Sequence, residues 1–221
     1  MTDAPTTEPA YPVQFSVDYP DRELDRLPTA ICIFIVIPIA IVLALLSGAT
    51  GPFPDAYPGS RARAEAWIAL GGSGVLWLAP LVMILFRQKY PRWWFDWNLN
   101  LVRFENRVAA YLFLLRDEYP STDEEQQVHL DFPYPDARND LNRWLPLVKW
   151  LLAIPHLVIL VFLALAALVV VIIAWFAILF TGRYPEGLFD FVVGVMRWGN
   201  RVQGYAFVLI TDRYPPFSLN P

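Results

Sequence analysis

Three long stretches of the chain carry no Asp, Glu, Lys or Arg, and they constrain the fold more than any other feature. They cover residues 27–54, 66–86 and 150–182. A helix needs about 20 mostly apolar residues to cross the hydrocarbon layer of a bilayer. The first two stretches therefore each predict one membrane span, near residues 28–47 and 66–86. We expect an α-helical integral membrane protein.

The third stretch is longer than an ordinary span. As one helix, residues 150–182 would measure roughly 50 Å at about 1.5 Å per residue, against a hydrocarbon layer of about 30 Å. Two structures fit this length, namely a hairpin that turns near residues 163–167 or one long helix that projects from the membrane. Residues 163–167 contain no Gly or Pro that would favour a turn.

The composition agrees with a membrane protein. The chain is 56% hydrophobic and 17% charged, whereas soluble domains average about 45–50% and 25%. A net charge of −4 leaves no basic surplus for a phosphate backbone, so we expect no nucleic-acid partner. Cys32 is the only cysteine, which excludes a disulfide scaffold. Residues 1–10 are acidic and Pro-rich, and they predict a disordered tail rather than a cleaved signal peptide.

The sequence also repeats itself. Residues 85–91 (LFRQKYP) recur as residues 179–185 (LFTGRYP), and the match continues without a gap through residues 106–108 and 200–202 (NRV in both). Such self-similarity predicts two tandem modules in the same sequence orientation. The predicted boundaries are a tail at 1–10, module 1 at 11–121, an acidic linker at 122–126, module 2 at 127–217 and a C-terminal tail at 218–221.

The repeat bears on the number of membrane passes. Since module 1 has two predicted spans, the repeat favours a hairpin in residues 150–182 and four passes in total, with three passes and one long helix as the alternative. Residues 87–146 contain eight Lys and Arg, against two in residues 47–65. The positive-inside rule then places both termini in the cytoplasm and residues 48–65 outside, in a bacterial plasma membrane.

Each module begins with residues that alternate between apolar and polar, at 13–19 and at 128–132. A period of two predicts short half-buried strands. We expect these two strands to pair with each other or with the tails of the modules.

A polar stripe follows the last predicted span of each module. At 100° per residue, its members fall on one side of an amphipathic helix that either lies at the membrane interface or docks on its twin. Paired arginines there are candidates for an anion, lipid-headgroup or partner site, and the aspartates are alternative internal partners for them. The candidates are Asp96, Arg103, Asn106 and Arg107 in module 1, and Asp190, Arg197, Asn200 and Arg201 in module 2.

Catalytic and metal-binding patterns are sparse. His156 lies inside the third apolar stretch, where a histidine can act as a metal or haem ligand or as a proton relay. No second His, Met or Cys stands at ligand spacing, so we expect a packing role for it. We accordingly predict no cofactor, no metal site and no enzymatic activity.

Several strings in module 2 resemble a bacterial membrane family catalogued as the domain of unknown function number 4389. They are AIPHL at 153–157, AWFAILFTGRYP at 174–185 and TDRYPPF at 211–217. Module 1 resembles a more divergent copy that lacks the histidine and the Thr-Gly pair. The resemblance implies a bacterial plasma-membrane protein and no particular activity.

These observations predict a non-catalytic accessory or scaffold subunit of a larger membrane complex, with the lipid bilayer and membrane proteins as partners. The alternative is an anionic-lipid or small-anion carrier that uses Arg103, Arg107, Arg197 and Arg201 at the cytoplasmic face. A membrane enzyme is a third hypothesis, and it rests on His156 alone.

Overall fold

The computed structural model describes residues 11–20, 22–46, 79–122, 124 and 126–220. This part of the chain is mostly helical, as expected, and residues 79–87 form a further helical segment. The labelled elements in chain order are β1 (Gln14–Val17), α1 (Arg26–Leu46), α3 (Arg92–Leu112), β2 (Val128–Asp131), α4 (Pro146–Thr181) and α5 (Glu186–Ala206).

The third apolar stretch forms one helix, so the predicted hairpin is wrong. α4 runs unbroken for 36 residues, because the leucines and alanines at 163–167 are good helix formers and nothing there terminates a helix. Among the described residues, α4 is the one helix that is long and apolar enough to cross a membrane. The structure therefore does not support two membrane passes in the second half, nor four passes in total.

The other predicted spans are described only in part. The first predicted span, 28–47, lies almost entirely within α1. Most of the second, 66–86, and the predicted extracytoplasmic residues 48–65 lie outside the described residues, as does the predicted tail at 1–10.

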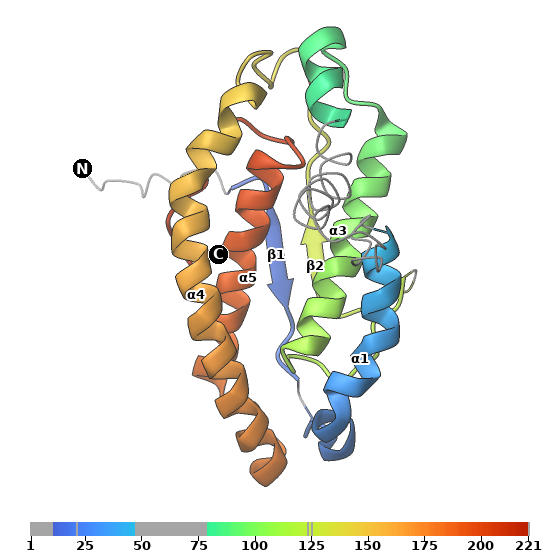
Figure 1. The fold of residues 1–221 in the computed structure, drawn as a ribbon, viewed down its shortest axis with the longest axis vertical. Coiled ribbons are helices and arrows are strands. Elements are labelled where there is room, and N and C mark those ends of the chain that lie inside the picture. Colours follow the sequence, from blue (N-terminus) through green and yellow to red (C-terminus); the bar gives the residue numbers. More distant parts are fainter. Residues whose placement is uncertain (1–10, 21, 47–78, 123, 125, 221) are drawn as a thin grey trace, which may run out of the picture.

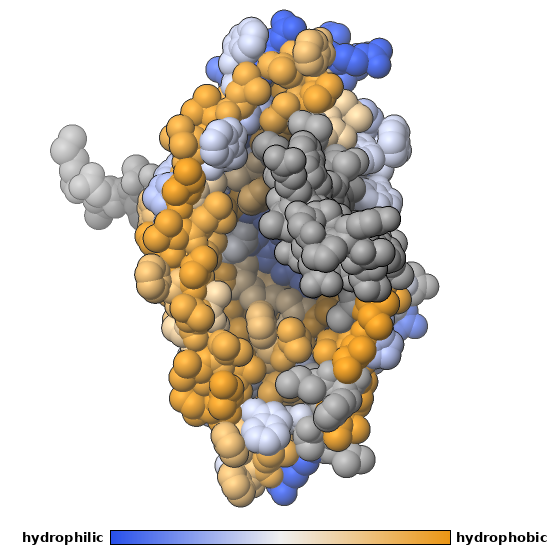
Figure 2. Space-filling model, in the orientation of Figure 1, coloured by the Kyte–Doolittle hydropathy of each residue, from blue (hydrophilic) through white to orange (hydrophobic). Residues whose placement is uncertain are grey.

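α4 buries only a narrow stripe of its surface. The stripe recurs at intervals of three or four residues or their sums, the pattern of a single helix face, and three of its members are alanines, which let a neighbouring helix approach closely. Most of the other side chains of α4 are exposed and apolar, and Figure 2 shows them as a hydrophobic band along the molecule. The buried residues are Pro146, Lys149, Ala153, His156, Ala167, Ala174 and Ile178.

The two predicted strands pair with each other. β1 and β2 are antiparallel, and Phe15 lies opposite Leu130. Alternate residues are buried in both strands, so one face of the sheet packs on helices and the other carries exposed polar side chains. The exposed ones are Gln14, Ser16, His129 and Asp131.

Helices cover the sheet in two successive layers. α5 contacts β1 and α4, whereas α3 contacts β2 and α1. α1 and α4 also contact each other, and the indole of Trp175 donates to the carbonyl of Thr29 over 3.1 Å. Figure 1 shows α5 and α4 next to β1, and α3 and α1 next to β2. The order from the sheet outward is therefore α3 and α5, then α1 and α4.

The turns that precede α3 and α5 are built alike. Gln88 has φ 46° and Gly182 has φ 74°, so both adopt the left-handed conformation that commonly ends a helix. The hydroxyl of Tyr134 donates to the carbonyl of Tyr90. In the same way, the hydroxyl of Tyr19 donates to the carbonyl of Tyr184. Each turn is thus fastened by a tyrosine from the other half of the chain.

Candidate functional site

Two asparagines meet where α3 and α5 cross. The Nδ2 of Asn106 donates to the Oδ1 of Asn200 over 2.8 Å, and the Nδ2 of Asn200 donates back to the Oδ1 of Asn106 over 2.7 Å. Each Nδ2 also donates within its own helix, to the carbonyl of Val102 or of Met196. Both side chains are buried. A reciprocal bond between matching residues is typical of a two-fold related interface.

Arg103 and Arg197 hold the sheet. The Nε of Arg103 donates to the carbonyl of Leu130 over 2.9 Å, and the Nε of Arg197 donates to the carbonyl of Phe15 over 3.0 Å. Phe15 and Leu130 are paired residues of β1 and β2. Each arginine therefore bonds the strand that comes from the other half of the chain. Arg197 also donates to the carbonyl of Leu219 over 2.8 Å.

Arg107 and Arg201 fasten the segments that follow their helices. Arg107 donates to the carbonyl of Ser121 over 2.9 Å, and Arg201 donates to the carbonyl of Ser218 over 3.3 Å. Arg201 is buried, with 4% of its surface exposed. Burial lowers the pKa of its guanidinium, and the charge of Arg197 lowers that pKa further.

The two aspartates of the stripe form none of the internal hydrogen bonds described for its arginines. Asp96 and Asp190 are exposed, and Arg103 forms its ion pair with Asp131 instead, over 3.5 Å. Asn106, Asn200 and the four arginines of the stripe thus form hydrogen bonds within the molecule. These guanidinium groups bond backbone carbonyls, which does not favour an anion site, and that site stays a prediction.

His156 lies in an aromatic cluster between α4, α5 and the C-terminal segment. Its side chain is fully buried, and its ring stacks on Phe217 with centroids 4.0 Å apart. The indole of Trp198 donates to its Nδ1 over 3.1 Å. Since an indole only donates, Nδ1 carries no proton and the imidazole is held in the neutral Nε2–H form. Its Nε2 is buried and has no hydrogen-bond partner among the described residues, and the packing role of His156 stays a prediction.

Lys149 forms a buried ion pair that the sequence reasoning missed. Its Nζ lies 2.6 Å from the Oδ1 of Asp212, donates to the carbonyl of Thr211 over 2.8 Å and lies 5.1 Å from the ring centroid of Tyr205. The backbone N–H of Asn142 donates to the other carboxylate oxygen of Asp212. A lone lysine directly before 33 uncharged residues was the available signal.

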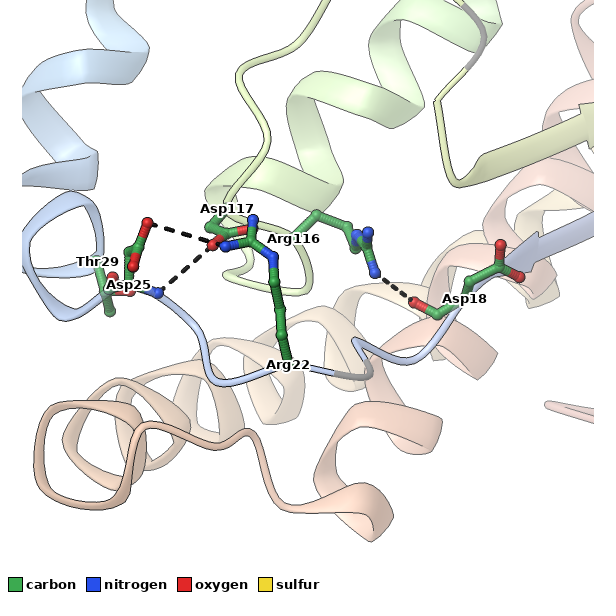
Figure 3. A network of polar contacts seen from close by, with 6 residues as sticks. All are labelled: Asp18, Arg22, Asp25, Thr29, Arg116 and Asp117. Atoms are coloured by element: carbon green, nitrogen blue, oxygen red, sulfur yellow. Dashed lines mark hydrogen bonds and ion pairs between the residues drawn. The ribbon is translucent and has the colours of Figure 1, made fainter.

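In the first half of the chain, an ion pair joins the segment before α1 to the segment after α3. Figure 3 shows Arg22 reaching Asp117, with 2.9 Å between Nη2 and Oδ1, and the backbone N–H of Asp25 donating to the same carboxylate. The guanidinium of Arg116 turns to the carbonyl of Asp18 over 3.2 Å. The side chain of Arg22 is 63% exposed and that of Asp117 is 7% exposed, so solvent reaches this ion pair from the side of the arginine.

Two cavities lie beside the fastened turns. The larger, of about 620 Å³, is lined by residues 88–92 and 134–138 with Asp140. The smaller, of about 440 Å³, is lined by residues in 19–24 and 183–186. Both carry basic and acidic side chains together, so neither has the one-sided charge of an ion-binding cleft. Within the described residues, no group of three or more His, Cys, Asp or Glu side chains could hold a metal ion.

The family model described as Domain of unknown function (DUF4389) matches residues 144–218. These residues, the DUF4389 segment, are therefore similar to that family. The match confirms the resemblance noted for module 2, whereas a divergent second copy in the first half stays a prediction. Among the curated proteins and the solved structures, nothing matches the chain.

The DUF4389 segment contains α4, α5 and most of the chain beyond them. Lys149, His156 and Asp212 all lie within it, together with Arg197 and Arg201. Both of the buried polar clusters that involve α4 therefore belong to the matched family segment.

Proposed function

We propose that this chain is a non-catalytic accessory or scaffold subunit of a larger complex in the bacterial plasma membrane. The observation that carries the proposal is the surface of α4, which exposes apolar side chains along its length, including Leu151 at 52%, Phe162 at 68% and Phe180 at 79%. A surface of this size and polarity requires lipid or another apolar partner. The asparagines and arginines of the stripe serve internal contacts, which is what a rigid framework needs.

The proposal includes two tandem modules of one design. Equivalent residues supply the reciprocal asparagine bond, the arginine contacts to the strands and the tyrosine contacts to the turns. Support for both termini on one side of the membrane comes from the hydroxyl of Tyr11, which donates to the carbonyl of Arg213 over 3.1 Å. That side is the cytoplasm in this proposal, because the basic residues of 87–146 border the same sheet and turns.

Exposed tryptophans on α3 offer a contact surface to the other subunits of the complex. Trp93 at the start of α3 is 67% exposed, and its ring lies 5.4 Å from that of Trp94, which in turn lies 5.6 Å from that of Trp97. Tryptophan is enriched among the residues that dominate binding energy at protein interfaces. The second half has Gly187 at the position that matches Trp93 in sequence.

The experiment is affinity purification of the chain from its native membrane. A tag is placed at the chromosomal locus, the membrane is solubilised in a mild detergent, and co-purifying proteins are quantified by mass spectrometry. A fixed set of proteins in stoichiometric amount is expected. A monodisperse chain that carries lipid alone would overturn the proposal.

A matched pair of variants sharpens this experiment. Trp93→Ala is expected to reduce the co-purifying proteins several-fold without changing the amount of tagged chain in the membrane. Trp144→Ala is the control, since Trp144 is 64% exposed but lies outside the α3 cluster.

A further inference from the structure

The described part of the molecule has one polar face and one apolar face. The outer side of the sheet exposes Gln14, Ser16, His129 and Asp131. The outermost helices, α1 and α4, expose isoleucine, leucine, valine and phenylalanine. In Figure 2 the hydrophilic residues gather at the two ends of the apolar band along α4 rather than on it.

α4 is longer than an upright membrane helix. Its 36 residues correspond to about 54 Å at about 1.5 Å per residue, whereas the hydrocarbon layer is about 30 Å thick. A tilt of about 40°, the upper end of the usual range, still leaves a height of roughly 41 Å. An upright or moderately tilted α4 would thus hold apolar side chains outside the hydrocarbon.

The sheet excludes an upright α4 more directly. β1 and β2 lie beside the middle of the long axis along which α4 runs (Figure 1), and Arg197 in the middle of α5 bonds the carbonyl of Phe15 in β1. Upright, α4 would place this two-stranded sheet, with the exposed polar side chains of its outer face, at the depth of the acyl chains. Polar side chains without water or a hydrogen-bond partner are costly there. The exposed carboxylate of Asp131 would add a further cost.

We propose that α4 lies along the plane of the membrane, with its outer face immersed in the acyl chains of one leaflet and the sheet in water. This inference rests on the membrane location proposed above and names its partner as a lipid surface. α3 and α5 then lie nearer the headgroups, since they stand between the sheet and the apolar helices. The charged residues at the ends of α4, such as Arg143 and Arg183, reach the headgroups of that same leaflet.

Three single-cysteine variants test this orientation. In a Cys32→Ser background, cysteines replace Leu151, Phe162 and Ile173, which are exposed on α4 and recur every eleven residues. That spacing keeps them within about 40° of one another around the helix. The full chain is labelled with a nitroxide in phosphatidylcholine–phosphatidylglycerol vesicles, and depth is measured from collision with oxygen and with a water-soluble nickel chelate. Ser16→Cys on the outer side of the sheet is the control.

The flat orientation predicts equal depths, within about 5 Å, at the three α4 positions and free access of the nickel chelate to position 16. An upright α4 would spread the outer two positions over about 33 Å with Phe162 deepest, and it would shield position 16; either result overturns the proposal. Free access of the chelate to all four labels would contradict the membrane location itself, which separates failure of the orientation from failure of the proposed function.

Discussion

The two halves of the chain share a framework and differ in what lies beneath their long apolar helices. Asn106 matches Asn200, and each donates to the other. By contrast, when Ile37–Pro38 is aligned with Ile154–Pro155, Lys149 and His156 of α4 fall on Cys32 and Ile39 of α1. Contacts present in both halves hold the two together, whereas the buried lysine and histidine occur only in the DUF4389 segment. The difference separates residues that any such framework needs from residues that specialise one half.

The largest effect is expected at Lys149, where the halves differ most. Lys149→Met leaves the carboxylate of Asp212 near the protein interior without its cation, and breaking such a pair costs about 3 kcal/mol. Thermal unfolding in detergent should show this loss. The comparison variant in the first half, Arg22→Met, should cost less, about 1 kcal/mol, because Arg22 is 63% exposed, although its partner Asp117 is only 7% exposed.

A second variant guards this comparison against a simple packing defect. Lys149→Met combined with Asp212→Asn removes both charges and should recover much of the lost stability. Equal losses in Lys149→Met and Arg22→Met would show that the buried pair gives the second half no special support.

The next prediction concerns the contact that the halves share. Asn106→Leu or Asn200→Leu each leaves one buried amide without its partner, at a cost of about 1–3 kcal/mol. The two single variants should lose similar stability, since the two side chains make matching contacts. The double variant should lose less than the sum, because two leucines can pack together. Strictly additive losses would mean that the two asparagines do not stabilise the α3–α5 crossing through their reciprocal bond.

The sequence predicted the local structure of this molecule well. Alternation in residues 13–19 and 128–132 located both strands, because a half-buried strand shows its period directly. The prediction failed at residues 163–167. There the argument from repetition required a turn, and a run of leucine and alanine with no glycine or proline formed helix instead.

The candidate site was harder to predict because its contacts join distant parts of the chain. The polar stripe pointed to Arg103 and Arg197, yet their acceptors are backbone carbonyls in strands from the other half, and carbonyls leave no mark on side-chain pattern. The Lys149–Asp212 pair joins the start of α4 to the segment after α5. Only the folded chain brings these two charges together.

Smaller effects on stability, with opposite signs in the two halves, are expected for substitutions in the turns that precede α3 and α5. Gly182 has φ 74°, and a Cβ added there would lie 3.1 Å from the Oε2 of Glu23. Gly182→Ala should therefore lower stability by about 1 kcal/mol. Gln88 holds a side chain at φ 46°, so Gln88→Gly relieves strain and should be neutral or slightly stabilising. Loss of stability in both variants, measured by thermal unfolding, would mean that the two turns do not play equivalent parts.

The smallest effect concerns a polar contact beside the asparagines that only one side of the crossing has. Gln203 donates to the Oε2 of Glu105 over 3.2 Å, and the sequence-matched positions are Ala109 and Gly199. Burial raises the pKa of Glu105, and the bond from Gln203 partly opposes this. Because the folded protein binds this proton more tightly than the unfolded chain, the contribution of Glu105 to stability is full below its ordinary pKa and is lost as pH rises through the raised one.

Glu105→Gln removes this half-buried charge, so the variant should be slightly more stable than the parent chain at pH 7, with a Tm higher by about 1–2 °C. Its stability should also vary less with pH above the ordinary pKa of a glutamate. Gln203→Leu should do the opposite, since without the donor the carboxylate is harder to ionise and the fall in stability with rising pH becomes steeper. If both variants kept the pH dependence of the parent chain, the Glu105–Gln203 contact would contribute nothing to it. The α3–α5 crossing would then be stabilised by the reciprocal asparagine bond and not by this contact.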